Sequence, residues 1–488
     1  MIRRNLKIRF IEPGNRPYRR SVWNWFIYDR TIRTPSNGML ILATILKSSY
    51  EDVLCYSESI SKIEWEDVLD ADLVCVSMFS YAAERGYELA DYIHDHSEAK
   101  VIIGGLHATL CPEEAAEHAD YVLCGEGDES LPALIREIAE GAPIDVPGVV
   151  YLDGANVVRC AEARTPVDIE TIPDRGLLYG FQKATRYPTI WPQVHASRGC
   201  PFHCDYCALV AAFGSGFRGR SPKTVVEDIR DAIDFFGKNS LLPLRVLWLT
   251  DDNFFADRIW AKRVLQAMID SQIKYRFTIQ ARYEVGFDDE MLSLLKEAGS
   301  IELAVGIEFL EDESFRAYHK KSTYREITQA VDNIKAHGLR VRGLFILGAD
   351  DHRPGVGRKL ADYVIEHDID GFLVQSMYFI PETKVYASHK AQLLQPGVWE
   401  HTTGKVVHRP LHMSATQLQG EMIDSISRIY SLRRLAHAIL RKRGLNRLLF
   451  MGEFLWMRSV RHNLRTDLKR LAELEKQRAE NVLHEVVE

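Results

Sequence analysis

The sequence lacks long apolar runs and has few cysteines, and both shortages narrow the classes of protein it can represent. No run reaches the roughly 20 apolar residues that a membrane-spanning helix needs, and residues 1–14 lack the apolar core of a signal peptide. Eight cysteines among 488 residues are too few for a disulfide scaffold. We therefore expect a cytoplasmic protein in a reducing compartment.

An excess of positive charge is missing as well. The chain has 61 Lys and Arg against 68 Asp and Glu, a net charge of −7, so we expect no nucleic-acid partner. A hydrophobic content of 46% with 26% charged residues is ordinary for a globular protein. The length exceeds what one hydrophobic core usually supports, and it predicts two or three domains.

The clearest motif lies near the middle of the chain, where residues 195–207 read HASRGCPFHCDYC. Cys200, Cys204 and Cys207 follow the spacing C-x3-C-x2-C, and a short loop can turn three thiolates toward one point. Three thiolates would leave one iron of a four-iron, four-sulfur cluster open for chemistry. Structural zinc with His203 or His195 as fourth ligand is the alternative. Zinc knuckles usually contain two C-x2-C units. Only one such unit is present here, so the pattern favours the iron–sulfur cluster over zinc.

This spacing, with Tyr206 directly before the last cysteine, resembles the signature of the radical S-adenosylmethionine (SAM) enzymes. The resemblance implies that Cys200, Cys204 and Cys207 bind a 4Fe-4S cluster. It also implies that the open iron binds SAM, which is cleaved to a 5′-deoxyadenosyl radical.

The first 150 residues alternate predicted strands and helices, which indicates a Rossmann-like, doubly wound parallel sheet. Ligands of such sheets lie beyond the carboxyl ends of the strands. The stretch IIGGLHATLCPEEAAEHADYVLCGEGDESLPALI resembles the cobalamin-binding domain of many radical SAM enzymes. No Asp-x-His-x-x-Gly motif is present, so cobalamin would bind without a histidine ligand from that motif. The expected cobalamin contacts are Ser77, Gly104, Gly105, His107, Gly125, Glu126 and Gly127.

From Gln193 the alternation resumes, and six strand–helix units fit the partial (β/α)6 barrel of radical SAM enzymes. Polar residues follow its strands at the carboxyl ends, where active residues of such barrels gather. Carboxylates at Asp251 or Asp252 could orient the SAM amino group through charge-assisted hydrogen bonds. The resemblance implies further contacts with SAM by Gln280, Arg282 and Glu308, and close approach of the ligand at Gly306.

Three segments outside these patterns have two interpretations each. Residues 16–34 hold five arginines together with Trp23, Trp25, Phe26 and Tyr28, and form either a surface loop or a cap over a ligand. His401, His408 and His412 suggest a mononuclear metal, but we favour a lid over the barrel mouth. A helix is predicted over residues 414–441, and residues 433–470 hold eleven Lys and Arg against two acidic residues. This basic region either contacts an anionic membrane surface or packs on the barrel.

The expected domains are a cobalamin-binding domain (1–142), a linker (143–188), a radical SAM partial barrel (189–385), and a C-terminal lid and helical domain (386–488). The whole pattern resembles the group of anaerobic magnesium-protoporphyrin ester cyclase and the hopanoid and phosphonate methylases. That resemblance implies a radical C-methyltransferase that uses methylcobalamin and a donor such as flavodoxin or ferredoxin. Radical oxidation, cyclisation or rearrangement with cobalamin as redox partner remains open, as does a non-enzymatic cobalamin or metal sensor. The substrate is expected to be a small molecule, and membrane contact would point to a hydrophobic one.

Overall fold

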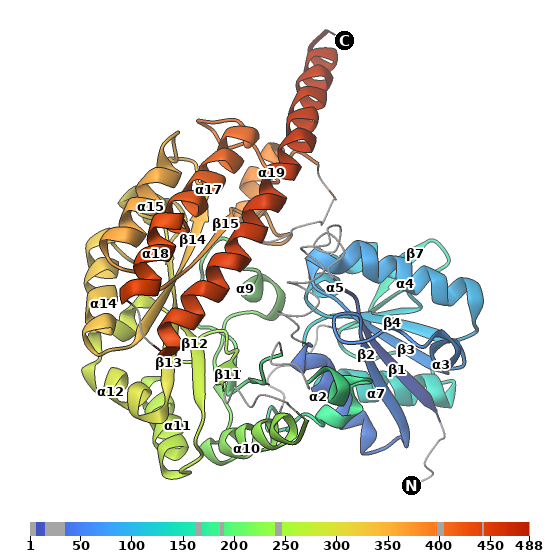
Figure 1. Ribbon diagram of the computed structural model, residues 1–488. Helices are drawn as coiled ribbons and strands as arrows, with labels where there is room; N and C mark the ends of the chain where they lie inside the picture. The colour runs from blue at the N-terminus through green and yellow to red at the C-terminus, as the bar shows by residue number, and fades with distance from the viewer. Residues whose placement is uncertain are drawn as a thin grey trace. The chain divides into compact units, whose positions relative to one another are not determined.

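The computed structural model describes residues 6–14, 35–161, 168–185, 190–239, 246–395, 397, 405–441 and 444–487. Residues 16–34, interpreted above as a loop or a cap, lie outside them. The chain forms two compact units (Figure 1). The first comprises residues 1–201, 209–252 and 259–276, and the second comprises residues 202–208, 253–258 and 277–488.

The first unit begins with the predicted doubly wound sheet, whose seven strands have the order β2-β1-β3-β4-β5-β6-β7. Its first five strands are parallel to their neighbours, and the last two form an antiparallel hairpin. The sequence analysis assigns this hairpin to a linker, whereas it extends the sheet. The strands are β1 (Lys7–Glu12), β2 (Asp52–Ser57), β3 (Leu73–Ser77), β4 (Lys100–Gly104), β5 (Tyr121–Leu123), β6 (Val149–Asp153) and β7 (Asn156–Arg159).

Helices cover both faces of this sheet, with α4 on one side and α2 and α7 on the other (Figure 1). Strands covered on both faces are apolar throughout, and the central segment Leu73–Val76 of β3 is buried accordingly. One α-helix lies between most neighbouring strands of the parallel part, and two short ones, α5 and α6, lie between β4 and β5. The helices are α2 (Asn37–Lys47), α3 (Trp65–Leu69), α4 (Ala83–His96), α5 (Leu106–Leu110), α6 (Pro112–Ala116) and α7 (Gly127–Glu140).

The rest of the first unit carries the start of the second αβ region. Strand β8 (Gln193–Val194) pairs in parallel with β11 (Val246–Leu249). Strand β9 (Ser197–Arg198) pairs antiparallel with β10 (Arg218–Gly219), which closes the segment between them into a loop. Helices α9 (Ala208–Phe213), α10 (Pro222–Asn239) and α11 (Arg258–Asp270) belong to this region.

The second unit continues the strand–helix alternation with parallel neighbours in the order β12, β13, β14 and β15. A capping box of Thr323 and Glu326 fixes the start of α14, as expected for this motif. The elements are β12 (Arg276–Ala281), α12 (Asp289–Ala298), β13 (Ser300–Glu308), α13 (Asp312–Ala317), α14 (Tyr324–Ala336), β14 (Arg340–Leu347), α15 (Val356–Glu366), β15 (Gly371–Ser376) and α16 (Lys384–His389).

The chain ends in three helices, α17 (Ala415–Ile429), α18 (Leu432–Arg441) and α19 (Gly444–Val487). The single helix predicted over residues 414–441 is therefore broken, at Tyr430 and Ser431. Helix α17 packs against α15 and α19. None of the described helices combines the length and the hydropathy that crossing a bilayer requires.

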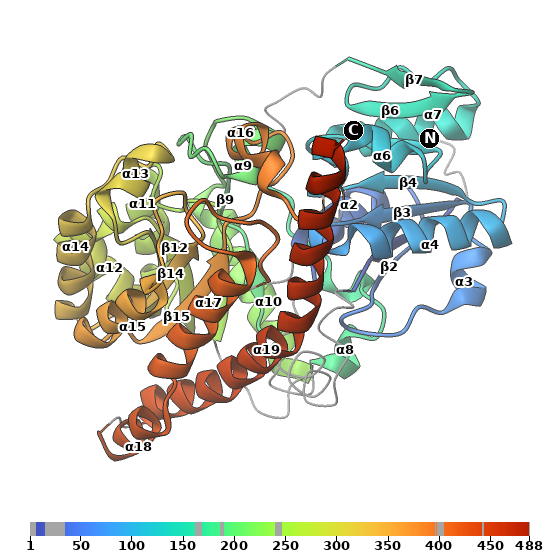
Figure 2. The same ribbon diagram turned by 90° about the horizontal axis from the view of Figure 1, so that it is seen from above.

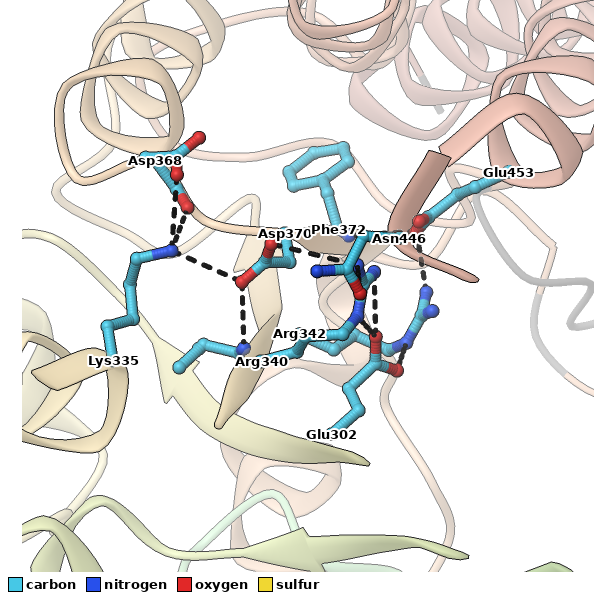
Figure 3. Close-up of polar contacts among 10 residues, drawn as sticks. Glu302, Lys335, Arg340, Arg342, Asp368, Asp370, Phe372, Asn446 and Glu453 are labelled. Atoms are coloured by element: carbon cyan, nitrogen blue, oxygen red, sulfur yellow. Dashed lines mark hydrogen bonds and ion pairs between the residues drawn. The ribbon is translucent and has the colours of Figure 1, made fainter. Parts of the chain in front are cut away.

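A buried charge network fastens α19 to the amino-terminal ends of β13, β14 and β15 (Figure 3). The Glu302 carboxylate accepts hydrogen bonds from Arg340 and, at 2.7 Å, from Arg342. Arg342 also donates to Glu453 of α19 at 2.6 Å, and the Phe372 backbone N–H donates to the same Glu453 oxygen at 3.1 Å. Burial by itself lowers the pKa of Arg342, but the Glu453 and Glu302 carboxylates raise it above its ordinary value, so α19 is held by charge as well as by packing.

Replacing Glu453 with alanine should lower the free energy of unfolding by about 3–5 kcal/mol, because it removes one partner of a buried ion pair. The measurement is urea unfolding followed by circular dichroism. The matched control is Asp362→Ala, which removes an exposed pair with Arg358 on α15 and should cost about 0.5 kcal/mol or less. Equal losses in the two variants would show that the network contributes nothing specific.

Candidate cluster and cofactor site

The loop closed by β9 and β10 carries the three clustered cysteines, and a glycine directly precedes the first of them. Gly199 has φ +84°, and a Cβ there would collide with the Gly216 carbonyl oxygen, so no larger residue fits before Cys200. The Cys207 N–H donates to the Cys204 carbonyl at 3.0 Å and closes a turn. All three cysteines are half-buried, and none of the three sulfurs is committed to a disulfide.

Asp251 and Asp252 follow β11, and the structure places them differently. Asp251 is 1% exposed, and its Oδ1 accepts hydrogen bonds from Ala196 N at 3.0 Å and Ser197 Oγ at 2.5 Å. Burial raises the pKa of Asp251 to about 7. Its carboxyl supports the strand before the cysteines, and its expected contact with SAM stays a prediction. Asp252 accepts from Gly199 N at 2.9 Å and is the residue that faces open space.

In the second unit, Glu308 and a lysine that the sequence analysis missed form a buried pair at the end of β13. Lys320 is 5% exposed, and its Nζ lies 3.3 Å from Glu308 Oε1 and donates to the Gly306 carbonyl at 2.7 Å. Glu308 has φ +67°, which is strained for a residue with a side chain. Burial lowers the pKa of Lys320. No spacing in the sequence marks Lys320, because it lies on a loop after α13.

Arg282 lies beside the cysteine loop after β12. Its Nη1 is 4.0 Å from Cys204 Sγ, its guanidinium lies 3.8 Å from the Phe202 ring centroid, and it donates to Glu284 at 2.7 Å. Gln280 is half-buried on β12. The structure thus brings Arg282 to Cys204, and its expected contact with SAM stays a prediction.

A cavity of about 630 Å³ in the first unit joins the strand ends of the N-terminal sheet to the segment before the cysteines. This volume is typical of small-molecule and cofactor sites. Gly105 has φ +97°, and a Cβ there would lie 2.7 Å from the Met78 carbonyl oxygen, so glycine is required at this wall. The lining includes six of the expected cobalamin contacts and four residues near the cysteines: Ser77, Gly104, Gly105, Gly125, Glu126, Gly127, His195, Ser197, Arg198 and Gly199.

His107, the seventh expected cobalamin contact, does not line this cavity. Its side chain is completely buried. One ring nitrogen lies 3.1 Å from Ser80 Oγ, and the other lies 3.1 Å from the Tyr87 hydroxyl and 3.3 Å from Glu114. The ring is thus surrounded by protein groups, and we assign His107 to the support of the turn at Gly105. Cys111 completes a group of possible metal ligands with His107 and Glu114, but the ring already has protein partners.

Ion pairs that the sequence analysis missed tie the loop after β5 to strands β9 and β10. Arg198 binds Asp128 with two hydrogen bonds of 2.9 Å. Arg218 binds Glu126, at 3.0 Å through Nη1 and more closely through Nη2. The partners lie 70 and 92 residues apart in the sequence, so no local pattern could reveal them. They hold two walls of the cavity together.

Two of the three histidines for which a metal site and a lid were weighed, with the lid favoured, lie in the described part of the chain. His401 lies outside the described residues. His408 is buried, with one ring nitrogen 3.0 Å from the Gly348 carbonyl oxygen, and burial lowers its pKa to about 4. His412 is exposed. The bond to Gly348 ties this segment to the end of β14, and its role as a lid stays a prediction.

Comparison with known proteins supports both halves of the site. Residues 194–353 match the radical SAM superfamily, and residues 33–135 match the B12 binding domain. The chain is 24% identical to the hopanoid C-2 methylase of Rhodopseudomonas palustris over 72% of its own length and 63% of the relative. It is 26% identical to the bacteriochlorophyllide d C-8(2)-methyltransferase of Chlorobaculum tepidum, over 66% and 69% of the two chains. The chain thus spans less than two thirds of the first of these relatives.

A solved structure shows the same fold. The cobalamin-dependent SAM radical enzyme OxsB, determined with aqua-cobalamin and SAM bound, superposes with a TM-score of 0.70 at 14% identity. The match covers 99% of this chain and 80% of that one. It confirms the predicted fold class, a Rossmann-like domain followed by a radical SAM partial barrel and a helical extension.

Replacing Asp251 with asparagine should flatten the pH dependence of stability. The folded-state pKa of about 7 lies above the ordinary value of 3.8 for an aspartate, so the stabilisation is complete below about pH 4 and is lost as the pH rises through 7. Between pH 5 and 8 the wild type should lose on the order of 3 kcal/mol more than Asp251→Asn. Urea unfolding of the apoprotein at both pH values measures this. The exposed Asp257→Asn is the control and should keep the wild-type dependence.

Proposed function

We propose that this chain, which belongs to the radical SAM enzymes with an N-terminal B12 binding domain, methylates an unactivated carbon of a small molecule. The observation that carries the proposal is the cavity in the first unit. Its walls come from the strand ends that hold ligands in doubly wound sheets and from the residues directly before Cys200. A ligand in this cavity would lie beside the cysteine loop. A non-enzymatic sensor would not need its ligand to lie beside a cysteine loop.

The three cysteines are the proposed ligands of a 4Fe-4S cluster. Their donor set fits, because thiolates are the usual ligands of such clusters and three of them leave one iron for SAM. When bound, the cluster supplies the electron that cleaves SAM to a 5′-deoxyadenosyl radical. Gly199 brings the backbone close around the loop, and Arg282 places a positive charge beside Cys204.

For SAM itself, we propose protein contacts to both its positively charged and its negatively charged groups. Asp252 presents a carboxylate toward the amino group, which forms a charge-assisted hydrogen bond. Glu308 and Lys320 offer one acceptor and one buried cation. Gln280 and Gly306 complete the proposed set. Asp251 acts indirectly by holding Ser197 and Ala196 in place.

Cobalamin is the proposed occupant of the cavity. The strand-end glycines, Gly104, Gly105, Gly125 and Gly127, leave room for a bulky group, and Ser77 adds a hydroxyl at the same edge. When bound, cobalamin supplies the methyl group that the radical on the substrate accepts. Glu126 faces the cavity but is paired with Arg218, so its proposed role is to shape the wall.

The proposed partners are a small, hydrophobic substrate and a low-potential electron donor such as flavodoxin or ferredoxin. We also propose a cytoplasmic location and a peripheral contact between the C-terminal helices and a membrane. The predicted domain bounds, 1–142, 143–188, 189–385 and 386–488, are kept as a proposal, with the hairpin of β6 and β7 joined to the first sheet.

The reaction is tested on protein reconstituted without oxygen with iron, sulfide and cobalamin, and then given SAM labelled in its methyl group together with a strong reductant. We expect 5′-deoxyadenosine, S-adenosylhomocysteine and label on the bound cobalamin. Cys204→Ala should lose the cluster and 5′-deoxyadenosine formation, because a cluster ligand is gone. Cys160→Ala, a half-buried thiol outside the motif, is the control. Cleavage of SAM with no S-adenosylhomocysteine and no labelled cobalamin would contradict methylation and favour a radical oxidation or cyclisation.

Filling the cavity should block cobalamin without affecting the cluster. The nearest atom to a Cβ at Gly104 would be 3.6 Å away, so Gly104→Val adds volume at the wall without a backbone clash. We expect cobalamin uptake to fall at least about tenfold, the effect of losing about 1.4 kcal/mol of binding energy, with iron content unchanged. Gly237→Val, at a glycine with open space around it, is the control. Unchanged uptake in Gly104→Val would place the cobalamin site elsewhere.

A further inference from the structure

Helix α18 and the first half of α19 carry apolar side chains that point into solvent. On α18 they recur at i, i+7 and i+8, and on α19 at i, i+3 and i+7, so each helix presents one stripe. Leu440 is 83% exposed and Leu432 is 68% exposed. Scattered exposed leucines need no explanation, but a contiguous set marks an interaction surface. We call the following set the outer stripe: Leu432, Ile439, Leu440, Leu448, Met451 and Leu455.

The outer stripe is not the face by which these helices pack on the protein. On α19 a different set, Phe450, Phe454 and Met457, is buried and follows the spacing i, i+4 and i+7. A helix that only covers the barrel needs one apolar face. Helix α19 has two in this region, and packing accounts for the inner one alone.

The charges around the outer stripe have one sign. Exposed arginines accompany it, among them Arg433, Arg447 and Arg458. Between residues 432 and 466 the sequence has a single acidic residue, Glu453, and that carboxylate is buried and paired with Arg342. The exposed surface of this segment is therefore apolar and basic.

The segment is also held firmly. Figure 3 shows Glu453 directed from α19 into the charge network at the strand ends of the second unit, and α17 packs against α19. Figure 2 shows α18 at the outer end of this group of helices. The outer stripe is thus presented by an element whose inner face is fixed.

We propose that α18 and the first half of α19 dock this protein on the surface of an anionic lipid bilayer. Apolar side chains of such a helix enter the boundary between headgroups and acyl chains, and each arginine near the surface adds about 1 kcal/mol of attraction to anionic lipids. A second copy of the chain fits less well, because a two-fold interface would bring the same arginines face to face. The contact is peripheral, since no described helix can span the bilayer.

The test is flotation of the reconstituted full-length protein with vesicles, which does not depend on the cofactor chemistry proposed above. We expect binding to equimolar phosphatidylcholine and phosphatidylglycerol, at least about tenfold weaker binding to phosphatidylcholine alone, and weakening by salt. Leu440→Glu combined with Leu448→Glu should reduce binding at least about tenfold, because it places charge in the apolar stripe. Ile259→Glu is the matched control: Ile259 is 68% exposed on α11, outside the stripe.

A second pair of variants tests the charges. Arg433→Glu combined with Arg447→Glu should reduce binding to anionic vesicles, whereas Arg325→Glu on α14 should not. Iron content and circular dichroism verify that each variant is folded. No vesicle binding, equal binding to neutral vesicles, or equal effects of stripe and control variants would overturn the proposal. So would a dimer that the Leu440→Glu and Leu448→Glu changes dissociate, since the stripe would then serve a second copy.

Discussion

The ion pairs between the β5–α7 loop and strands β9 and β10 are the constraint on which the cavity depends. Asp128 and Glu126 follow β5, and Arg198 and Arg218 flank the cysteine loop. Partly buried pairs of this kind give little net stability, because desolvation offsets most of the attraction. Their value is geometric: a two-bond contact between Arg198 and Asp128 fixes direction as well as distance. These ion pairs thereby hold the cavity wall that follows β5 and the strands that flank the cysteine loop in one arrangement.

Asp251 also fixes the position of one segment against another through side-chain hydrogen bonds. Its buried carboxyl binds Ala196 and Ser197, so β11 is joined by a side chain, as well as by backbone pairing, to the segment that leads into the cysteines. A pKa of about 7 shows that burial there is costly for the charged form. The molecule tolerates this cost at a position where an ordinary apolar residue would leave two donors without an acceptor.

The sequence predicts the parts of this site that depend on local spacing. Strand and helix periods located β14 and α12, and the C-x3-C-x2-C spacing located the cluster loop. It could not tell Asp251 from Asp252, because consecutive residues at a strand end point in opposite directions and only packing decides which is buried. Nor could it find Lys320 or the partners of Arg198, since those contacts join segments far apart in the chain. The sequence also does not show that the His107 side chain, which follows two strand-end glycines, turns into the protein rather than toward the cavity.

In the second unit, the charge network and the proposed site residues lie at opposite ends of the strands, which agrees with the general arrangement of α/β barrels. The network of Glu302, Arg342 and Glu453 lies where the strands begin, and Glu308 with Lys320 lies where β13 ends. Fastening α19 at the amino-terminal ends keeps this network away from the carboxyl-terminal ends, where Glu308 lies and where His408 contacts Gly348 at the end of β14. This attachment also leaves the outer face of α18 and α19 without a packing role. An apolar, basic face that folding does not use is therefore best explained by a partner, and its charge selects an anionic one.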